Sequence, residues 1–171
     1  MMQNKTIEII PMQARDIANA VGLISQAMNQ DEGKWASETM HFHFKCAEQE
    51  LDDGHDYYLW WEHDEVKGIV GLHQYAWGPP ENVWLAWFAV SPAEQGKGYD
   101  RALLDEVEKK ARQRGFRKFF VETYAHPDFD KAIRFYQKYG FTEHGRIANY
   151  LPDGSQMIVL GKSLSSGRRL E

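Results

Sequence analysis

The sequence contains little that marks a secreted, membrane-bound or nucleic-acid-binding protein. Cys46 is the one cysteine among 171 residues, so no disulfide can form within the chain, which fits a reducing cytoplasm. The start, MMQNKTIEIIP, is too short and too mixed in polarity for a signal peptide, and no apolar run approaches the length that crosses a bilayer. The net charge of -5 argues against nucleic acid or an anionic membrane as the main partner. We therefore expect a cytoplasmic protein.

The composition is that of a folded, water-soluble domain. Hydrophobic residues make up 43% of the chain and charged residues 26%, and the length allows a substantial core. We expect one domain over residues 1–165. Residues 166–171 are treated as a tail outside the fold, because they end in a Leu-Glu pair of the kind that cloning leaves.

Hydrophobic periodicity predicts alternating strands and helices along the chain. Strands are expected at 5–12, at 57–77 as a pair with a turn near 64–65, at 82–90, at 118–125, and at 141–164 as a hairpin around PDG. Helices are expected at 14–30, at 35–54 with Ser37 as cap, at 101–115 and at 130–140. The segment NVWLAWFAV (82–90) has almost no polar residue, which predicts a central strand buried on both faces. This order predicts an α/β (α+β) fold with a mixed sheet.

The segment VSPAEQGKGYDRALL predicts an anion-binding turn. An apolar strand ends at Val90, a Gly-Lys-Gly turn follows, and a helix then begins. Two glycines allow a sharp turn and a close approach to a ligand, and the first N–H groups of a helix attract phosphate. The alternative is that the glycines only make a tight turn. Neither the P-loop pattern nor the dinucleotide fingerprint fits, because Tyr99 follows Gly98 and the glycine spacing differs.

This segment resembles the acetyl-CoA-binding motif of the GNAT family of N-acetyltransferases, Gln/Arg-x-x-Gly-x-Gly/Ala between a strand and a long helix. A second segment, AIRFYQKYGF, is similar to the family's Ala-x-x-Phe-Tyr-x-x-x-Gly-Phe. Both stand in the family's order, and the resemblance covers about residues 5–164. It implies a mixed, mostly antiparallel central sheet flanked by helices, with two splayed central strands that hold the acetyl thioester between them.

The resemblance also implies the cofactor site. The main chain near Ala89 and Val90 would pair with the pantetheine arm of acetyl-CoA, as an added strand would. The backbone amides that would hold the pyrophosphate belong to Gln95, Gly96, Lys97, Gly98, Tyr99, Asp100 and Arg101. Two positions depart from the family pattern. Asp100 stands where the motif ends in Gly or Ala, and acids at Asp128 and Asp130 replace an asparagine, so negative charge is added on the cofactor side.

The resemblance implies that Tyr136 is the acid that protonates the leaving thiolate. A phenol suits this role because it is neutral and donates a hydrogen bond at pH 7. The alternative is that Tyr136 packs in the core, as we expect of Tyr139. Trp84 occupies the position of the glutamate base of some relatives. Glu122 is the preferred substitute, since a carboxylate on a strand lining the gap can be desolvated. His73, His126 and a bound water chain remain alternative bases.

The acceptor site is expected among the aromatic residues that precede the glycine turn. Trp84, Tyr75 and His73 are the candidate substrate-binding residues, because aromatic rings hold cationic amines well. Acids such as Glu38, Asp52 or Asp53 would supply counter-charge. No spacing of His and Cys predicts a metal site.

Three functions remain open on the sequence alone. The first is acetyl transfer from acetyl-CoA to a primary amine of a small molecule by direct attack. The second is an acyl-CoA-binding sensor or interaction protein without turnover. The third is acetylation of a protein N-terminus or lysine. The partners expected are acetyl-CoA and an amine, with neither nucleic acid nor membrane, and the oligomeric state is open to a homodimer.

Overall fold

One mixed sheet organises the chain, in a computed structural model that describes residues 5–164. Its strands are β1 (Ile10–Pro11), β2 (His55–Glu62), β3 (Glu65–His73), β4 (Asn82–Leu85), β5 (Ala89–Val90), β6 (Lys118–Tyr124), β7 (Thr142–Ile147) and β8 (Met157–Ser163). The order across the sheet is β1-β2-β3-β4-β6-β8-β7, and β5 pairs with β3. The neighbours β4 and β6 are parallel, and every other described pair is antiparallel. The predicted fold class is confirmed.

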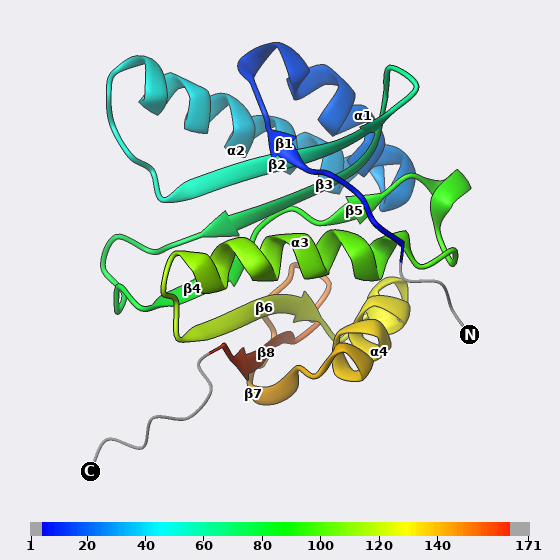
Figure 1. The fold of residues 1–171 in the computed structure, drawn as a ribbon. Coiled ribbons are helices and arrows are strands. Elements are labelled where there is room, and N and C mark those ends of the chain that lie inside the picture. Colours follow the sequence, from blue (N-terminus) through cyan, green and yellow to red (C-terminus); the bar gives the residue numbers. More distant parts are fainter. Residues whose placement is uncertain (1–4, 165–171) are drawn as a thin grey trace.

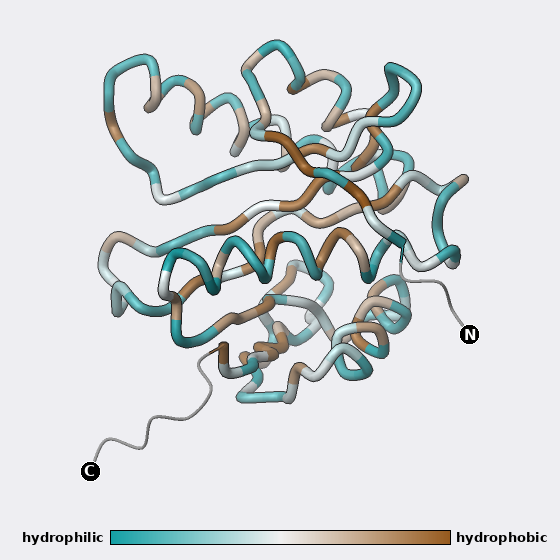
Figure 2. Tube along the Cα trace, in the orientation of Figure 1, coloured by the Kyte–Doolittle hydropathy of each residue, from teal (hydrophilic) through white to brown (hydrophobic). Residues whose placement is uncertain are grey.

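Helices cover both faces of this sheet (Figure 1). The helices α1 (Ile17–Ala27) and α2 (Gln30–Glu48) pack on one face, and α3 (Tyr99–Gln113) and α4 (Asp130–Tyr139) on the other. Alternate strand residues serve the two cores: on β3, Ile69 points to the α1/α2 core and Val70 to the α3/α4 core. Figure 2 shows hydrophobic residues along the strands and polar residues on the outer sides of the helices.

Two element predictions need correction at the N-terminal side. The helix expected from residue 35 begins at Gln30, and its cap is Asn29 and not Ser37, because the Asn29 side chain accepts the N–H of Glu32 at 2.9 Å. The strand expected over residues 5–12 is reduced to Ile10–Pro11. Ile7 and Ile9 are buried in the α3/α4 core although no ladder is formed there. Their alternation therefore reflects side-chain burial and not strand pairing.

The strand expected over residues 82–90 is broken in two. β4 pairs with β6 only as far as Trp84 opposite Phe120. β4 ends at Leu85, and the next three residues have no strand structure. β5 then pairs with β3 and not with β6. The sheet consequently opens between β5 and the second half of β6, which is the splayed arrangement implied by the family resemblance. This opening positions the candidate site.

Candidate functional site

The glycine turn lies directly before α3, as predicted. Gly96 and Gly98 have φ angles of 74° and 87°, in the left-handed region that favours glycine. Gly98 caps the helix and Tyr99 is its first residue. The turn therefore presents the N-terminal end of a 15-residue helix, with its partial positive charge, at the end of β5.

A cavity of about 450 Å³ joins this turn to the opening in the sheet. On the α3/α4 side its wall includes Gln95, Gly96 and Asp100 from the turn, Ala89 and Val90 from β5, and Phe135 and Tyr136 from α4. On the α1/α2 side its wall includes Glu32, His55, His73, Tyr75, Trp84, Glu122 and Tyr124. One continuous space thus passes from one face of the sheet to the other.

Tyr136 lines this cavity from α4. Its side chain is 7% exposed, and burial raises the pKa of its phenol above the ordinary value. Within the described chain the hydroxyl has no hydrogen-bond partner, whereas the hydroxyl of Tyr139 donates to Asp105 at 2.6 Å. Tyr136 is thus a neutral donor that faces the cavity, and Tyr139 is a structural residue, as expected.

Glu122 lies on β6 at the edge of the opening. Its carboxylate accepts the hydroxyl of Tyr124 at 2.7 Å, which fixes the side chain toward the α1/α2 side. The neighbouring Thr123 points to the other face of the strand, and its buried hydroxyl has no hydrogen-bond partner in the described structure. Both residues line the cavity, so β6 offers polar groups to both halves of it.

Glu32 is a cavity residue that the sequence analysis missed. It is the third residue of α2, its side chain is 7% exposed, and it forms no ion pair among the described residues. Burial, and then repulsion from Asp31 and Glu122, raises the pKa of its carboxyl. The spacing Asn29-x-x-Glu32 at a helix start was the available signal. The predicted helix began too late to reveal it.

Aromatic rings form the wall around these two acids. Trp84 stacks on Phe120 with ring centroids 4.9 Å apart, and Tyr75 meets Trp84 edge-on at 5.5 Å. His73 stacks on His55 at 3.7 Å with an interplanar angle of 7°. Burial, and then the nearby His55, lowers the pKa of His73 to about 4. The three predicted substrate-binding residues therefore lie together, and His73 is a neutral, weakly basic group at pH 7.

Asp53 is tied up by histidines and lies behind this wall. Its carboxylate oxygens are 2.7 Å from His43 Nδ1 and 3.1 Å from His55 Nδ1. Burial opposes ionisation, but the hydrogen bonds from the two histidines lower the pKa of Asp53 below its ordinary value. Its charge therefore fixes His55 and does not serve as the counter-charge proposed for it. Glu38 and Asp52, the other two acids proposed, are exposed and outside the cavity.

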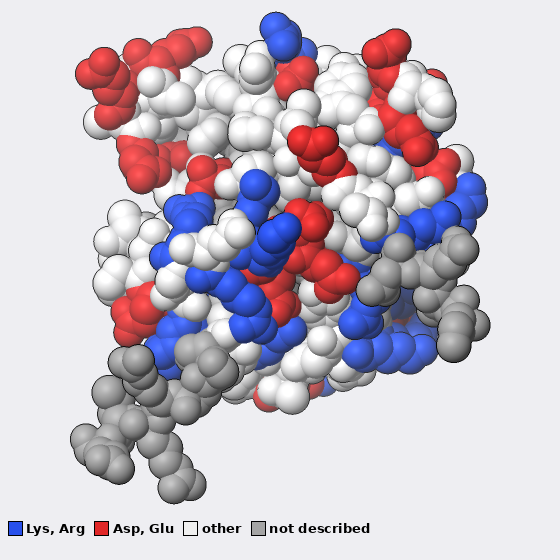
Figure 3. Space-filling view, viewed as in Figure 1, with Lys and Arg blue, Asp and Glu red and all other residues white. Residues whose placement is uncertain are grey.

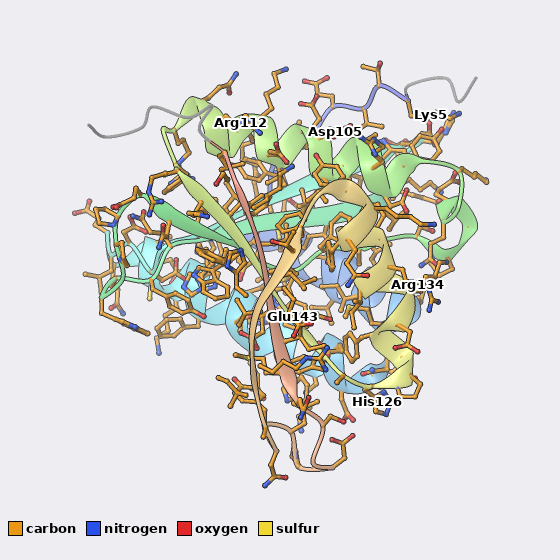
Figure 4. All side chains as sticks on the ribbon, turned by 90° about the horizontal axis from the view of Figure 1, so that it is seen from below. Lys5, Asp105, Arg112, His126, Arg134 and Glu143 are labelled. Carbon is orange, nitrogen blue, oxygen red and sulfur yellow. The ribbon has the colours of Figure 1, made fainter. Side chains whose placement is uncertain are left out.

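Other predicted residues also point elsewhere. Lys97 pairs with Glu94 at 3.2 Å, Tyr99 stacks on Trp60 at 4.4 Å, and Arg101 is directed to Asp105 at 4.0 Å. Their backbone amides still belong to the turn. His126 does not line the cavity, and Figure 4 shows it at the periphery, beyond the N-terminal end of α4.

Asp100 interacts with the turn itself. Its Oδ1 accepts the backbone N–H of Arg101 at 2.9 Å, which is one of the amides expected to hold a phosphate. Asp128, the other acid at a departing position, lines the cavity, whereas Asp130 does not. Figure 3 shows Lys and Arg side chains over α3 and around its right-hand end, where the helix begins. Acidic and basic groups therefore both surround the turn.

Comparison with known proteins identifies the family. The model of the acetyltransferase (GNAT) family matches residues 21–141, and the chain belongs to this family. A crystal structure assigned to the GNAT acetyltransferases of Desulfovibrio desulfuricans superposes with a TM-score of 0.82 at 22% identity, covering 94% of this chain and 100% of the other.

Two further solved structures share the fold. The Escherichia coli ribosomal-protein-S18-alanine N-acetyltransferase has a TM-score of 0.73 at 20% identity, with coverage of 96% and 98%. An aminoglycoside 6'-N-acetyltransferase complexed with coenzyme A superposes with a TM-score of 0.73 at 16% sequence identity, covering 95% of this chain and 100% of the other. A search of curated proteins finds no match.

The described part of the chain was also searched for two other features. No helix among residues 5–164 is long and apolar enough to cross a membrane. Within the same residues, no three His, Cys, Asp or Glu side chains are grouped as metal ligands.

Proposed function

We propose that the protein transfers an acetyl group from acetyl-CoA to a primary amine of a small molecule. One observation carries the proposal: a single cavity contains the glycine turn, the opening between β5 and β6, the Tyr136 phenol and the Glu122 carboxylate. Members of the GNAT family use acetyl-CoA, and one structural neighbour holds coenzyme A.

The α3/α4 side of the cavity fits the donor substrate. The free edge of β5 at Ala89 and Val90 suits the amides of a pantetheine arm, and the turn from Gln95 to Arg101 suits a pyrophosphate. A Cβ atom on Gly96 would meet no other atom within 4 Å, so the space beside this glycine is open to a ligand. Asp100 lies at this turn, and its negative charge disfavours phosphate.

Two side chains supply the proton transfers. Glu122 takes a proton from the acceptor ammonium, and the free amine nitrogen then bonds to the thioester carbonyl carbon. The carbon–sulfur bond breaks, and the leaving thiolate takes the proton of the Tyr136 hydroxyl. The nitrogen releases a second proton, which restores the phenol. The products are the amide, the CoA thiol and one proton on Glu122.

The acceptor side favours a small molecule over a polypeptide. Aromatic rings and two acids enclose it, and the whole cavity of about 450 Å³ must also receive the thioester. This volume lies at the lower end of pockets for small ligands.

Release of free CoA over a panel of small primary amines tests the proposal. Glu122→Gln should lower kcat by about 100-fold because it removes the proton acceptor. Glu143→Gln is the matched control, since Glu143 pairs with Arg146 at 2.7 Å on β7, outside the cavity. Absence of CoA release with every amine would contradict the proposal. An unchanged kcat in Glu122→Gln would assign proton removal to water and leave the transferase proposal standing.

A second candidate is acyl-CoA binding without turnover. The contact between Asp100 and the Arg101 amide favours it, because it weakens the anion site on which cofactor affinity depends. Native mass spectrometry that finds bound CoA, together with no CoA release from acetyl-CoA and amines, would select this candidate.

A further inference from the structure

Glu32 has a charge that the fold does not satisfy. Its carboxyl is buried and lines the cavity, and no lysine, arginine or histidine pairs with it in the described structure. Four carboxylates line the cavity, from Glu32, Asp100, Glu122 and Asp128, against the single lysine or arginine among the described lining residues, Lys131. Lys131 belongs to α4, on the other side of the sheet. The α1/α2 side of the cavity, where the acceptor is proposed to bind, thus has negative charge without compensation. We call this side the acceptor half.

Helix capping does not account for Glu32. In a complete capping box the glutamate would return a hydrogen bond to the backbone N–H of Asn29. Only the other half is present, in which Asn29 accepts from the Glu32 amide at 2.9 Å. The helix dipole favours an acid at this position, yet the pKa of Glu32 is raised. Burying the carboxylate therefore costs stability in the free protein, and a ligand can recover that cost.

The reacting amine is a poor partner for this carboxylate. Attack on the thioester needs a neutral nitrogen, and an ion pair with a carboxylate stabilises the ammonium form. Glu122, held by Tyr124 at the edge of the opening, accepts the proton in the proposed reaction. A second carboxylate on the same nitrogen would oppose that step. Glu32 instead suits a positive group that stays charged throughout.

We propose that the acceptor is a short aliphatic diamine, with one amine at the opening near Glu122 and the second, as ammonium, paired with Glu32. The inference rests on the proposed acetyl transfer and adds the class of acceptor. Glu32 and Glu122 line the same half of one cavity of about 450 Å³, which suits an acceptor with a short spacer between its two amines. The rings of Tyr75, Trp84 and Tyr124 line the same half of the cavity and suit an alkylammonium chain.

The test compares diamines with matched monoamines. CoA release is measured at pH 7.5 with 1,4-diaminobutane, 1,5-diaminopentane, butylamine, pentylamine and 4-amino-1-butanol. In the wild type, kcat/KM should be about 30-fold or more higher for each diamine than for its monoamine, the range expected of a buried charge pair. Glu32→Gln should reduce this ratio to about 3-fold or less, mainly through a higher KM for the diamines. Glu32→Asp should restore part of the preference.

The control is Asp31→Asn, which removes the adjacent but exposed charge and should keep the preference for diamines. A binding measurement without acetyl-CoA complements the kinetics: 1,4-diaminobutane should raise the melting temperature of the wild type and not that of Glu32→Gln. Equal kcat/KM for diamines and monoamines, or an unchanged ratio in Glu32→Gln, would overturn the inference and leave acetyl transfer intact. No turnover of any amine would contradict the proposed function. The melting data would then decide on the diamine site.

Discussion

The two halves of the cavity are built in different ways. The half beside α3 and α4 comes mainly from the segment 89–100 and from residues 128–136, with Thr123 of β6. It offers the edge of β5, backbone amides, the ring of Phe135 and the phenol of Tyr136. The half beside α1 and α2 takes side chains from α2, β2, β3, β4 and β6. It offers carboxylates, imidazoles and aromatic rings.

The two halves therefore differ in how strongly ligand binding would depend on particular side chains. A ligand bound through backbone groups requires glycines and a helix start, but few specific side chains. A ligand bound through side chains depends on which residues five elements bring together. In the proposed function, the first half binds the donor that the family shares, and the second half selects the acceptor of this chain. Variants on the two sides should consequently change different quantities.

Among the variants at Tyr136, Asp100 and Glu32, the largest effect is expected for Tyr136→Phe. Losing the phenol should lower kcat by roughly 10–100-fold while acetyl-CoA affinity changes little, because the donor to the thiolate is lost and the ring is kept. Steady-state CoA release and titration calorimetry measure the two quantities. Tyr139→Phe is the matched control, since its hydroxyl is bonded to Asp105, and its kcat should stay near wild type. A folded Tyr136→Phe with unchanged kcat would leave Tyr136 a packing residue.

An intermediate effect is expected for Asp100→Gly, on the cofactor side alone. Two unit charges about 4 Å apart repel by about 4 kcal/mol at an effective dielectric of 20, against about 0.3–1 kcal/mol gained from the helix dipole. The variant also frees the Arg101 amide. Acetyl-CoA should bind about tenfold more tightly, which is about 1.4 kcal/mol, and the free protein should be slightly less stable.

Asp100→Asn separates the two causes, because it removes the charge and keeps an oxygen that can accept the Arg101 amide. Affinities are compared at low and high salt, since salt screens the charge term. Equal affinity of wild type and Asp100→Gly at low salt would mean that the carboxylate swings clear of the phosphates.

The smallest effect is expected for the stability of Glu32→Gln, on the acceptor side alone. The folded state raises the pKa of Glu32, so ionisation costs stability at pH values above that pKa, and the cost disappears as pH falls below the ordinary glutamate value. Glu32→Gln should therefore melt about 2–4 °C higher at pH 7.5, equivalent to about 1 kcal/mol. The gain should shrink toward zero near pH 4.

Calorimetry over pH 4–7.5 measures this gain, with Glu38→Gln as control, because Glu38 is an exposed glutamate of the same helix. An increase in melting temperature that is equal at every pH, or that also occurs in Glu38→Gln, would show that the ionised carboxylate of Glu32 does not destabilise the free protein.

The glycine turn and the placement of Tyr136 could be predicted from the sequence, while the binding of a cofactor by these residues stays a prediction. Gly96 and Gly98 adopt the left-handed conformation that their place before a helix requires, and Tyr136 stands at the cavity as its motif implied. The signals lie within segments of about ten residues, where backbone conformation is decided by near neighbours. The error in this region was the break in 82–90, because a run of apolar residues does not tell where a ladder ends.

The acceptor half could be predicted only in part. Trp84, Tyr75 and His73 come together as expected, but Glu32 was missed as a cavity residue, and Glu38 and Asp52 lie outside the cavity. No local sequence feature tells which of these acids is buried at the cavity, because that depends on how the helices and strands pack. Asn29 starts α2 early enough to place Glu32 on the buried side, while Glu38 faces solvent.

The sequence by itself determined most of the order of strands and helices, the glycine turn before α3 and the family, since these depend on periodicity and on local backbone preference. The tertiary structure alone decided which charges are buried. Burial depends on how residues far apart in the chain are packed: Glu32 on α2 and Glu122 on β6 line the same cavity. Such packing removes water from a carboxylate and brings like charges near it, and both effects raise its pKa.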